Sequence, residues 1–161
     1  MQNLKELIQS IEQEIQTQKI NNALDLLTAF DRYQGKDWRE YFPSTQPEEK
    51  YRILHQDEDF KLVLIYWPIA RTSSKHGHMK GGGLMRVLSG SLKETRFHPE
   101  DTEYTLGTYT YETGDLSYIH DALALHTVKN TEEAPAVSLH LYCKGIGSTF
   151  GVYDKKLGRT G

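Results

Sequence analysis

Short strand-like segments separated by turns occupy most of the chain after residue 60. The run FKLVLIYW (60–67) has the length and the apolar content of a buried strand. About eight short strands with regular turns favour a sandwich or a small barrel over a parallel sheet with alternating helices. We therefore expect an all-β fold. The other expected strands cover residues 84–90, 91–97, 108–113, 116–119, 123–128 and 136–142.

The first third of the chain has a different pattern. Apolar residues at positions 4, 7, 8, 11 and 15 recur at the spacing of one helical face. Asn21 and Asn22 can cap a second helix, which would present an apolar face between residues 23 and 30. We expect one domain over residues 1–161, in which helices in the 1–45 segment pack on a β-barrel over residues 50–155.

The composition excludes several classes of function. The 161 residues include 19 basic and 22 acidic side chains, a net charge of -3. Without clustered basic charge, neither nucleic acid nor an anionic membrane is an expected partner. No apolar run is long enough to cross a membrane, and the amino terminus lacks the regions of a signal peptide, so we expect a cytoplasmic protein. The single cysteine, Cys143, excludes an internal disulfide and leaves the seven histidines as the main source of metal ligands.

His76 and His78 form an H-x-H pair within HGHMKGGG. Alternate side chains of an extended strand point to the same side, so both imidazoles can face one metal ion. The pair alone is a weak signal, because a histidine is often only a hydrogen-bonded core residue. A second segment, HTVKN, begins at His126. Of the other histidines, His55, His98 and His120 lie in expected turns or strand ends and are not expected to bind a metal.

The two histidine segments, in this order, resemble the two motifs of the cupin superfamily. Cupins are double-stranded β-helix barrels with a metal inside, so the resemblance implies His76, His78 and His126 as the ligands. In the family the first motif also supplies a Glu, and Gly83 stands at that position here. The resemblance therefore implies a site made of three histidines without a carboxylate.

Within the cupins, the chain resembles cysteine dioxygenase, the thiol dioxygenase branch. The resemblance rests on LSGSLKETRF (88–97), LHTVKN (125–130) and PAVSLHLY (135–142), which follow one another in the family's order. It implies ferrous iron as the cofactor and L-cysteine and dioxygen as substrates, with cysteine sulfinic acid as the product. Three neutral imidazoles suit this chemistry, because they leave the metal its full charge for an anionic thiolate. The family precedent is a monomer.

The resemblance also implies the residues around the substrate. Ser138, His140 and Tyr142 share one face of an expected strand and correspond to the family's Ser-His-Tyr triad, although alternation alone would equally describe a buried hydrogen-bonded trio. Arg52 corresponds to the arginine that binds the substrate carboxylate through two parallel hydrogen bonds. The residues expected to line the pocket, or else to close the strand-end core, are Ile65 and Trp67.

Gly83 has a second implication. In mammalian members of the family, this position holds a cysteine that is cross-linked to the active-site tyrosine. We expect an unmodified Tyr142 here, because Cys143 points to the other face of the strand. Arg52 favours cysteine over 3-mercaptopropionate, but a dioxygenase of that or another small thiol stays open. The alternative from another class is a non-catalytic cupin that binds a small ligand.

Overall fold

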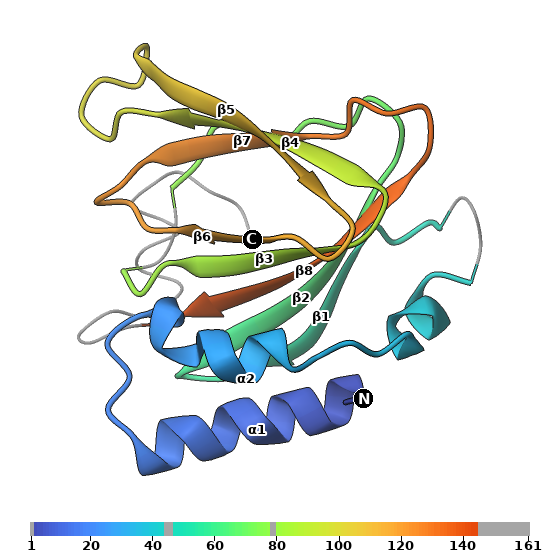
Figure 1. Cartoon of the computed structure of the whole chain (residues 1–161), viewed down its shortest axis with the longest axis vertical. Coiled ribbons are helices and arrows are strands. Elements are labelled where there is room, and N and C mark those ends of the chain that lie inside the picture. Colours follow the sequence, from blue (N-terminus) through green and yellow to red (C-terminus); the bar gives the residue numbers. More distant parts are fainter. Residues whose placement is uncertain (1, 44–46, 78–79, 145–161) are drawn as a thin grey trace.

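The structure is a computed structural model that describes residues 2–43, 47–77 and 80–144. Its strands form two antiparallel sheets, and the helices lie at the amino-terminal end of the chain (Figure 1). The expected all-β class with amino-terminal helices is confirmed. The elements are α1 (Leu4–Thr17), η1 (Ala23–Leu26), α2 (Leu27–Asp31), η2 (Asp37–Tyr41), β1 (Tyr51–Gln56), β2 (Phe60–Trp67), β3 (Gly83–Ser89), β4 (Ser91–Phe97), β5 (Thr105–Glu112), β6 (Leu116–Ile119), β7 (Leu125–Lys129) and β8 (Ala136–Cys143).

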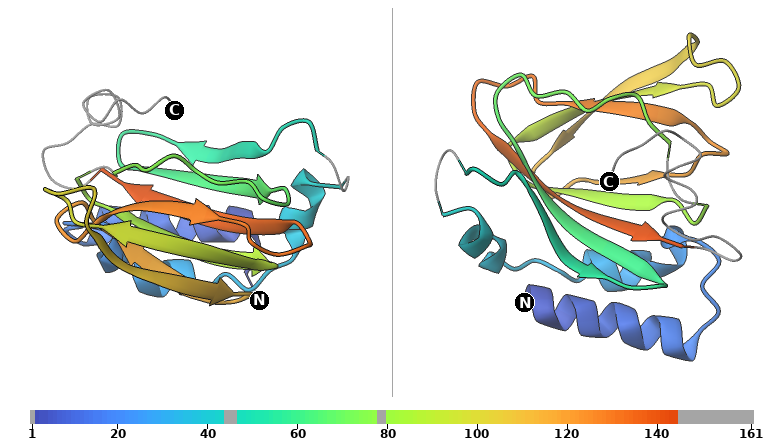
Figure 2. Two further views of the ribbon diagram at one scale, coloured as in Figure 1. Left: turned by 90° about the horizontal axis from the view of Figure 1, so that it is seen from above. Right: turned by 180° about the vertical axis from the view of Figure 1, so that it is seen from behind.

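The two sheets lie one over the other (Figure 2), and apolar side chains pack between them. Within the described residues, the larger sheet has the strand order β1-β2-β8-β3-β6 and the smaller one the order β5-β4-β7. The β3–β4 turn is made at Gly90, whose φ of 78° favours glycine, as the sequence indicated. No helix in the described part of the chain is long and apolar enough to cross a membrane.

The helices cover the outer face of the larger sheet, on the side away from β4, β5 and β7 (Figure 1). α1 begins at a capping box: Asn3 accepts a hydrogen bond from the backbone N–H of Glu6, and the Glu6 carboxylate accepts one from the backbone N–H of Asn3. The second expected helix is shorter than its apolar pattern indicated. Asn22 caps the 3-10 turn η1, which leads directly into α2.

Strands β2 and β8 present alternate side chains to two separate cores. Leu62 and Leu64 on β2 pack with Leu139 and Leu141 of β8 beneath the helices. The intervening residues face the space between the two sheets, which we call the interior. Because directly opposed residues of an antiparallel pair share a face, the paired positions on β2 and β8 reach the same core. The apolar residues of the interior include Val63, Ile65, Trp67, Met85, Val87, Leu92, Val128 and Ala136.

Strand β1 was not among the expected strands. It pairs with β2 at the edge of the larger sheet, and its register shifts between Ile53 and His55. Such a bulge interrupts the period of two that identifies a strand in a sequence. The edge position also leaves polar residues exposed along it, which weakens the apolar signal further.

Candidate active site

His76 and His126 come from distant parts of the chain and lie side by side. They form an isolated antiparallel bridge, in which each backbone N–H donates to the other's carbonyl oxygen over 3.0 Å. Their Nε2 atoms are 2.9 Å apart, and the ring planes are inclined at 75°. His78, the third expected ligand, lies outside the described residues.

The outer nitrogens of both rings are held by hydrogen-bond acceptors. His76 Nδ1 lies 2.7 Å from the carbonyl oxygen of Ser74, and His126 Nδ1 lies 2.6 Å from a carboxylate oxygen of Glu94. Because those oxygens accept, each Nδ1 carries the hydrogen and donates it. Each Nε2 therefore presents a lone pair to the space between the rings. Two such lone pairs repel each other unless a cation or a proton lies between them.

The spacing of these nitrogens fits a metal ion. Two ligands at right angles, each about 2.0–2.1 Å from a metal, lie roughly 2.9 Å apart. A ligating imidazole commonly donates its other N–H to a carbonyl or a carboxylate, as both rings do here. The donor set and its supports therefore suit a divalent transition metal.

Glu94 of β4 is fully buried behind His126. One of its oxygens accepts the hydrogen bond from His126, and the other accepts from Arg96 Nε over 2.8 Å and from the Tyr111 hydroxyl over 2.9 Å. Burial raises the pKa of Glu94, but the hydrogen bonds from His126 and Arg96 and the charge of Arg96 outweigh it and hold the pKa below its ordinary value. In the sequence, Glu94 has no signal of this role beyond its place in LSGSLKETRF.

The structure brings Ser138, His140 and Tyr142 together in the interior. Ser138 Oγ lies 2.6 Å from His140 Nε2, and the Tyr142 hydroxyl lies 3.3 Å from His140 Nδ1. Trp67 donates its indole N–H to Ser138 Oγ over 2.8 Å. Trp67 and its neighbour on the same face, Ile65, are both buried in the interior core.

The Trp67 contact fixes one role of Ser138. An indole N–H only donates, so Ser138 Oγ accepts from Trp67 and keeps its hydrogen and a second lone pair for other contacts. The contacts of His140 with Ser138 and Tyr142 therefore fit either tautomer of the ring, and when Ser138 donates to Nε2, Nδ1 carries a hydrogen that it donates to the Tyr142 oxygen. Burial, with a smaller effect of nearby His126, lowers the pKa of His140 to about 3, so the ring is neutral near neutral pH.

Gly83 lies directly opposite Tyr142 in the β3–β8 pair. A Cβ atom at this position would be 3.0 Å from Cδ1 of the tyrosine ring. The residue at position 83 is therefore next to the phenol, and glycine offers no sulfur there. Cys143 is buried with the residues beneath the helices, on the other face of β8.

The structure places Arg52 away from the interior. Arg52 pairs with Leu64, whose side chain packs beneath the helices, whereas its neighbour Tyr51 pairs with Ile65 and packs in the interior core. The Arg52 guanidinium forms an ion pair of 2.8 Å with Glu49, and the side chain is 42% exposed. Strand alternation is the physical reason: because Tyr51 takes the inner face, Arg52 takes the outer one. The arginine is thus not brought together with the other expected site residues.

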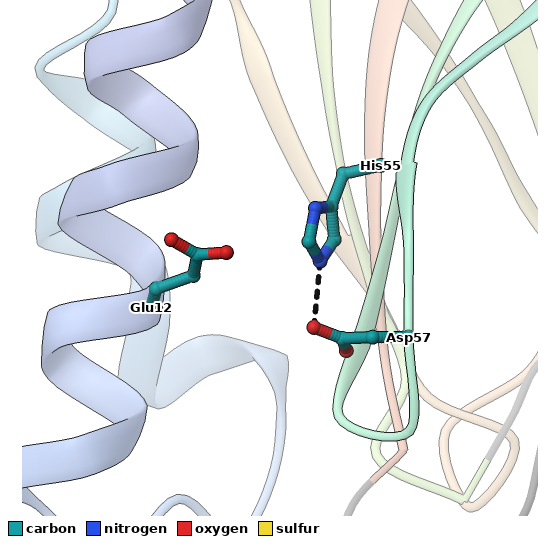
Figure 3. Close-up of side chains that lie close together, drawn as sticks. All are labelled: Glu12, His55 and Asp57. Atoms are coloured by element: carbon teal, nitrogen blue, oxygen red, sulfur yellow. Dashed lines mark hydrogen bonds and ion pairs between the residues drawn. The ribbon is translucent and has the colours of Figure 1, made fainter.

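A second group of potential metal ligands lies where α1 packs against the β1–β2 hairpin (Figure 3). Glu12, His55 and Asp57 offer ligand atoms that all lie within 4.8 Å of one another. His55 Nε2 is 2.7 Å from one Asp57 oxygen, and the other Asp57 oxygen accepts from two backbone N–H groups of the hairpin turn. Neither carboxylate is buried, so water can stabilise both charges without a metal.

Comparison with known proteins establishes the family. A sequence model of the family described as cysteine dioxygenase type I matches residues 1–156. The chain belongs to that family. It is 29% identical over 164 residues to cysteine dioxygenase type 1 of Danio rerio, with 96% of this chain and 81% of the relative covered. It is 28% identical over 145 residues to the protein of that name from Rattus norvegicus, with 85% and 72% covered.

A solved structure supports the fold of this cysteine dioxygenase family member. An uncharacterized Klebsiella pneumoniae protein with a double-stranded beta-helix domain matches it with a TM-score of 0.54 and 13% identity, over 73% of this chain and 95% of that chain. The expected cupin barrel is therefore confirmed. Membership of the family also implies a metal centre.

Proposed function

We propose that the chain is an iron(II)-dependent dioxygenase that converts L-cysteine and dioxygen to cysteine sulfinic acid. The observation that carries the proposal is the pair of Nε2 lone pairs of His76 and His126, 2.9 Å apart and each oriented by an acceptor on its Nδ1. We assign His78 as the third ligand from the family's motif. His78 lies two residues after His76 in the sequence, between His76 and the start of β3.

Ferrous iron held by these three histidines would acidify the substrate thiol and supply the one-electron chemistry that dioxygen needs. The chain itself adds no carboxylate ligand at position 83, so a thiolate meets no ligand charge that repels it. The negative charge of Glu94 would act on the metal only indirectly, because Glu94 accepts a hydrogen bond from the ligand His126 and is not itself a ligand.

Ser138, His140 and Tyr142 position a hydrogen-bond donor. With Ser138 donating to His140 and His140 donating to Tyr142, the Tyr142 hydroxyl would donate to an anionic oxygen of the substrate. His140 stays neutral and connects Ser138 to Tyr142 through its two ring nitrogens. Ile65 and Trp67 line the same space with apolar surface, which excludes water from the reacting sulfur.

We further propose that Tyr142 is unmodified, because position 83 is a glycine and Cys143, the single cysteine of the sequence, is buried on the opposite face of β8. An intact-mass measurement and peptide mapping test this: a peptide containing a Cys143–Tyr142 thioether would contradict it. A monomeric, cytoplasmic enzyme is the form that we expect, and size-exclusion chromatography with light scattering tests its oligomeric state.

Oxygen consumption by the iron-loaded protein tests the activity. L-Cysteine, 3-mercaptopropionate and cysteamine are compared side by side, and the sulfinate product is quantified by mass spectrometry. We expect uptake with L-cysteine and an equimolar yield of sulfinate, with the zinc-loaded protein as an inactive control. No uptake with any thiol would overturn the enzymatic proposal in favour of a ligand-binding cupin. Preference for 3-mercaptopropionate would instead make the protein a dioxygenase of that thiol. Both thiols need to be compared, because Arg52, the residue that favoured cysteine in the sequence, does not face the interior.

A further inference from the structure

The cluster of Glu12, His55 and Asp57 lies outside the barrel, on the side that the helices cover (Figure 3). Glu12 comes from α1, His55 from β1 and Asp57 from the turn that joins β1 to β2. The proposed dioxygenase reaction uses none of these three residues. Their chemistry is therefore separate from that of the histidines in the interior.

Two of the three side chains are held in position by the fold. The His55 ring stacks on the ring of Phe60, which is fully buried, with centroids 4.2 Å apart and planes inclined at 14°. One Asp57 oxygen accepts from the backbone N–H groups of Asp59 and Phe60, and the other lies 2.7 Å from His55 Nε2. An imidazole nitrogen and a carboxylate oxygen thus lie side by side, at the distance that two adjacent ligands of one metal ion would have.

The Glu12 carboxylate points from α1 towards this pair (Figure 3). Its place on the helix is fixed by the preceding residue, Ile11, which is fully buried in the core beneath the helices. Among the described residues, no hydrogen bond or ion pair engages the Glu12 carboxylate, and no lysine or arginine pairs with Asp57. Two carboxylates beside a neutral imidazole repel each other, and a divalent cation between them would remove that repulsion.

We propose that Glu12, His55 and Asp57 form a second metal site, which binds zinc or a similar divalent transition metal. One imidazole nitrogen and two carboxylate oxygens are ordinary zinc ligands, and water completes the coordination. Calcium and magnesium take oxygen ligands, so the imidazole disfavours both. Ferrous iron binds such a donor set more weakly than zinc does.

Such an ion connects α1 to the β1–β2 hairpin. The side chains of His55 and Asp57 are 19% and 40% exposed, so water reaches the cluster and the ion can enter and leave it. Because the ligands come from two elements that are far apart in the sequence, the ion binds the folded arrangement and stabilises the contact between helix and hairpin. The second site therefore makes the attachment of α1 to the barrel depend on metal.

Zinc stoichiometry tests the site in four proteins: the wild type, His55→Ala, His126→Ala and the double variant. Equilibrium dialysis against zinc, followed by elemental analysis, should give two ions per chain in the wild type, one in each single variant and none in the double variant. A wild type that binds no more zinc than His55→Ala would overturn the proposal. Zinc that persists in the double variant would also overturn it, because the second ion would then have other ligands.

Two matched substitutions on α1 test the role of Glu12. Calorimetry in the His126→Ala background should show that Glu12→Gln lowers the zinc affinity about tenfold or more, since the loss of a mere supporting partner already costs this much. Glu14→Gln removes the same charge about 200° around the helix axis and should leave the affinity unchanged. Equal losses in the two variants would show that α1 attracts zinc only by its overall charge.

Hydrogen exchange measures the effect on the helix directly. Zinc should slow the exchange of the α1 backbone N–H groups in the wild type and leave it unchanged in His55→Ala, because only the wild type can bind the ion between helix and hairpin. Equal exchange of α1 with and without zinc in the wild type would overturn the connecting role of the ion. None of these measurements depends on oxygen uptake, so the second site and the dioxygenase proposal can fail independently.

Discussion

Trp67 donates its indole N–H to the hydroxyl of Ser138 over 2.8 Å, deep between the two sheets. This contact makes Ser138 an acceptor towards Trp67 and holds its oxygen 2.6 Å from His140 Nε2. Trp67 thus belongs to a chain of hydrogen bonds that ends at the Tyr142 hydroxyl.

Replacing the indole tests this role. Trp67→Phe keeps an aromatic ring but removes the donor, so Ser138 can turn its hydrogen away from His140. We expect kcat to fall about tenfold, the equivalent of one buried hydrogen bond, while the bound iron stays at the wild-type level. Steady-state kinetics and metal analysis measure both quantities. Equal kcat values for Trp67→Phe and the wild type would show that the direction of the chain is set elsewhere.

Glu94 should control metal affinity through His126. Glu94→Gln removes the charge that His126 Nδ1 donates to, and we expect metal affinity to fall about 10–100-fold. Competition with a chelator of known affinity measures the loss. Tyr111→Phe is the matched control, because it removes one hydrogen bond from the same carboxylate and leaves its charge. An equal loss in both variants would mean that general packing around β4, and not the charge, holds the metal.

The two clusters of potential ligands can be distinguished by metal content. His126→Ala should abolish stoichiometric iron binding, because it removes one of the two facing Nε2 atoms. His55→Ala should leave the iron content unchanged, since His55 pairs with Asp57 on the helix-covered side of the larger sheet. Elemental analysis of the purified variants checks this. Loss of iron from His55→Ala would show that the metal binds at Glu12, His55 and Asp57 instead.

His140 should make the fold sensitive to acid. Burial lowers its pKa to about 3, whereas in the unfolded chain the pKa is close to 6.5. Between these values the unfolded state binds a proton that the folded state does not. The free energy of unfolding should therefore decrease as the pH falls from about 6.5 towards 3, by up to about 1.4 kcal/mol per pH unit from this residue.

Urea unfolding at several pH values measures that contribution. His140→Gln cannot take up the proton, so its stability should depend less on pH than that of the wild type in this interval. The carboxylates titrate in both proteins and cancel in the difference. Identical pH dependences for wild type and variant would show that folding does not lower the pKa of His140.

Much of the fold could be predicted, because its strands are short, strongly apolar and punctuated by turns. β2 has the bounds of its apolar run, and Gly90 makes the expected turn. The face shared by Ser138, His140 and Tyr142 also follows from alternation alone. β1 was missed because a bulge interrupts its period and because it lies at an edge.

The side chains of the candidate site were harder to predict where the pairing between strands determines which face of the sheet they occupy. In the sequence, Arg52 corresponds to the arginine that binds the substrate carboxylate in the family. In the structure, Tyr51 pairs with Ile65 and faces the interior, so Arg52, the next residue, faces outward. Glu94 gains its role from a residue on another strand, which no local pattern in the sequence could indicate.

The alternation along β8 has an evolutionary consequence. Ser138, His140 and Tyr142 of the proposed site lie on its inner face, whereas Val137, Leu139, Leu141 and Cys143 pack beneath the helices, within a single strand. Substitutions on one face need not be compensated on the other. The inner face can therefore change its substrate while the outer face preserves the protein's stability, and the helical cover can diverge without altering the reaction.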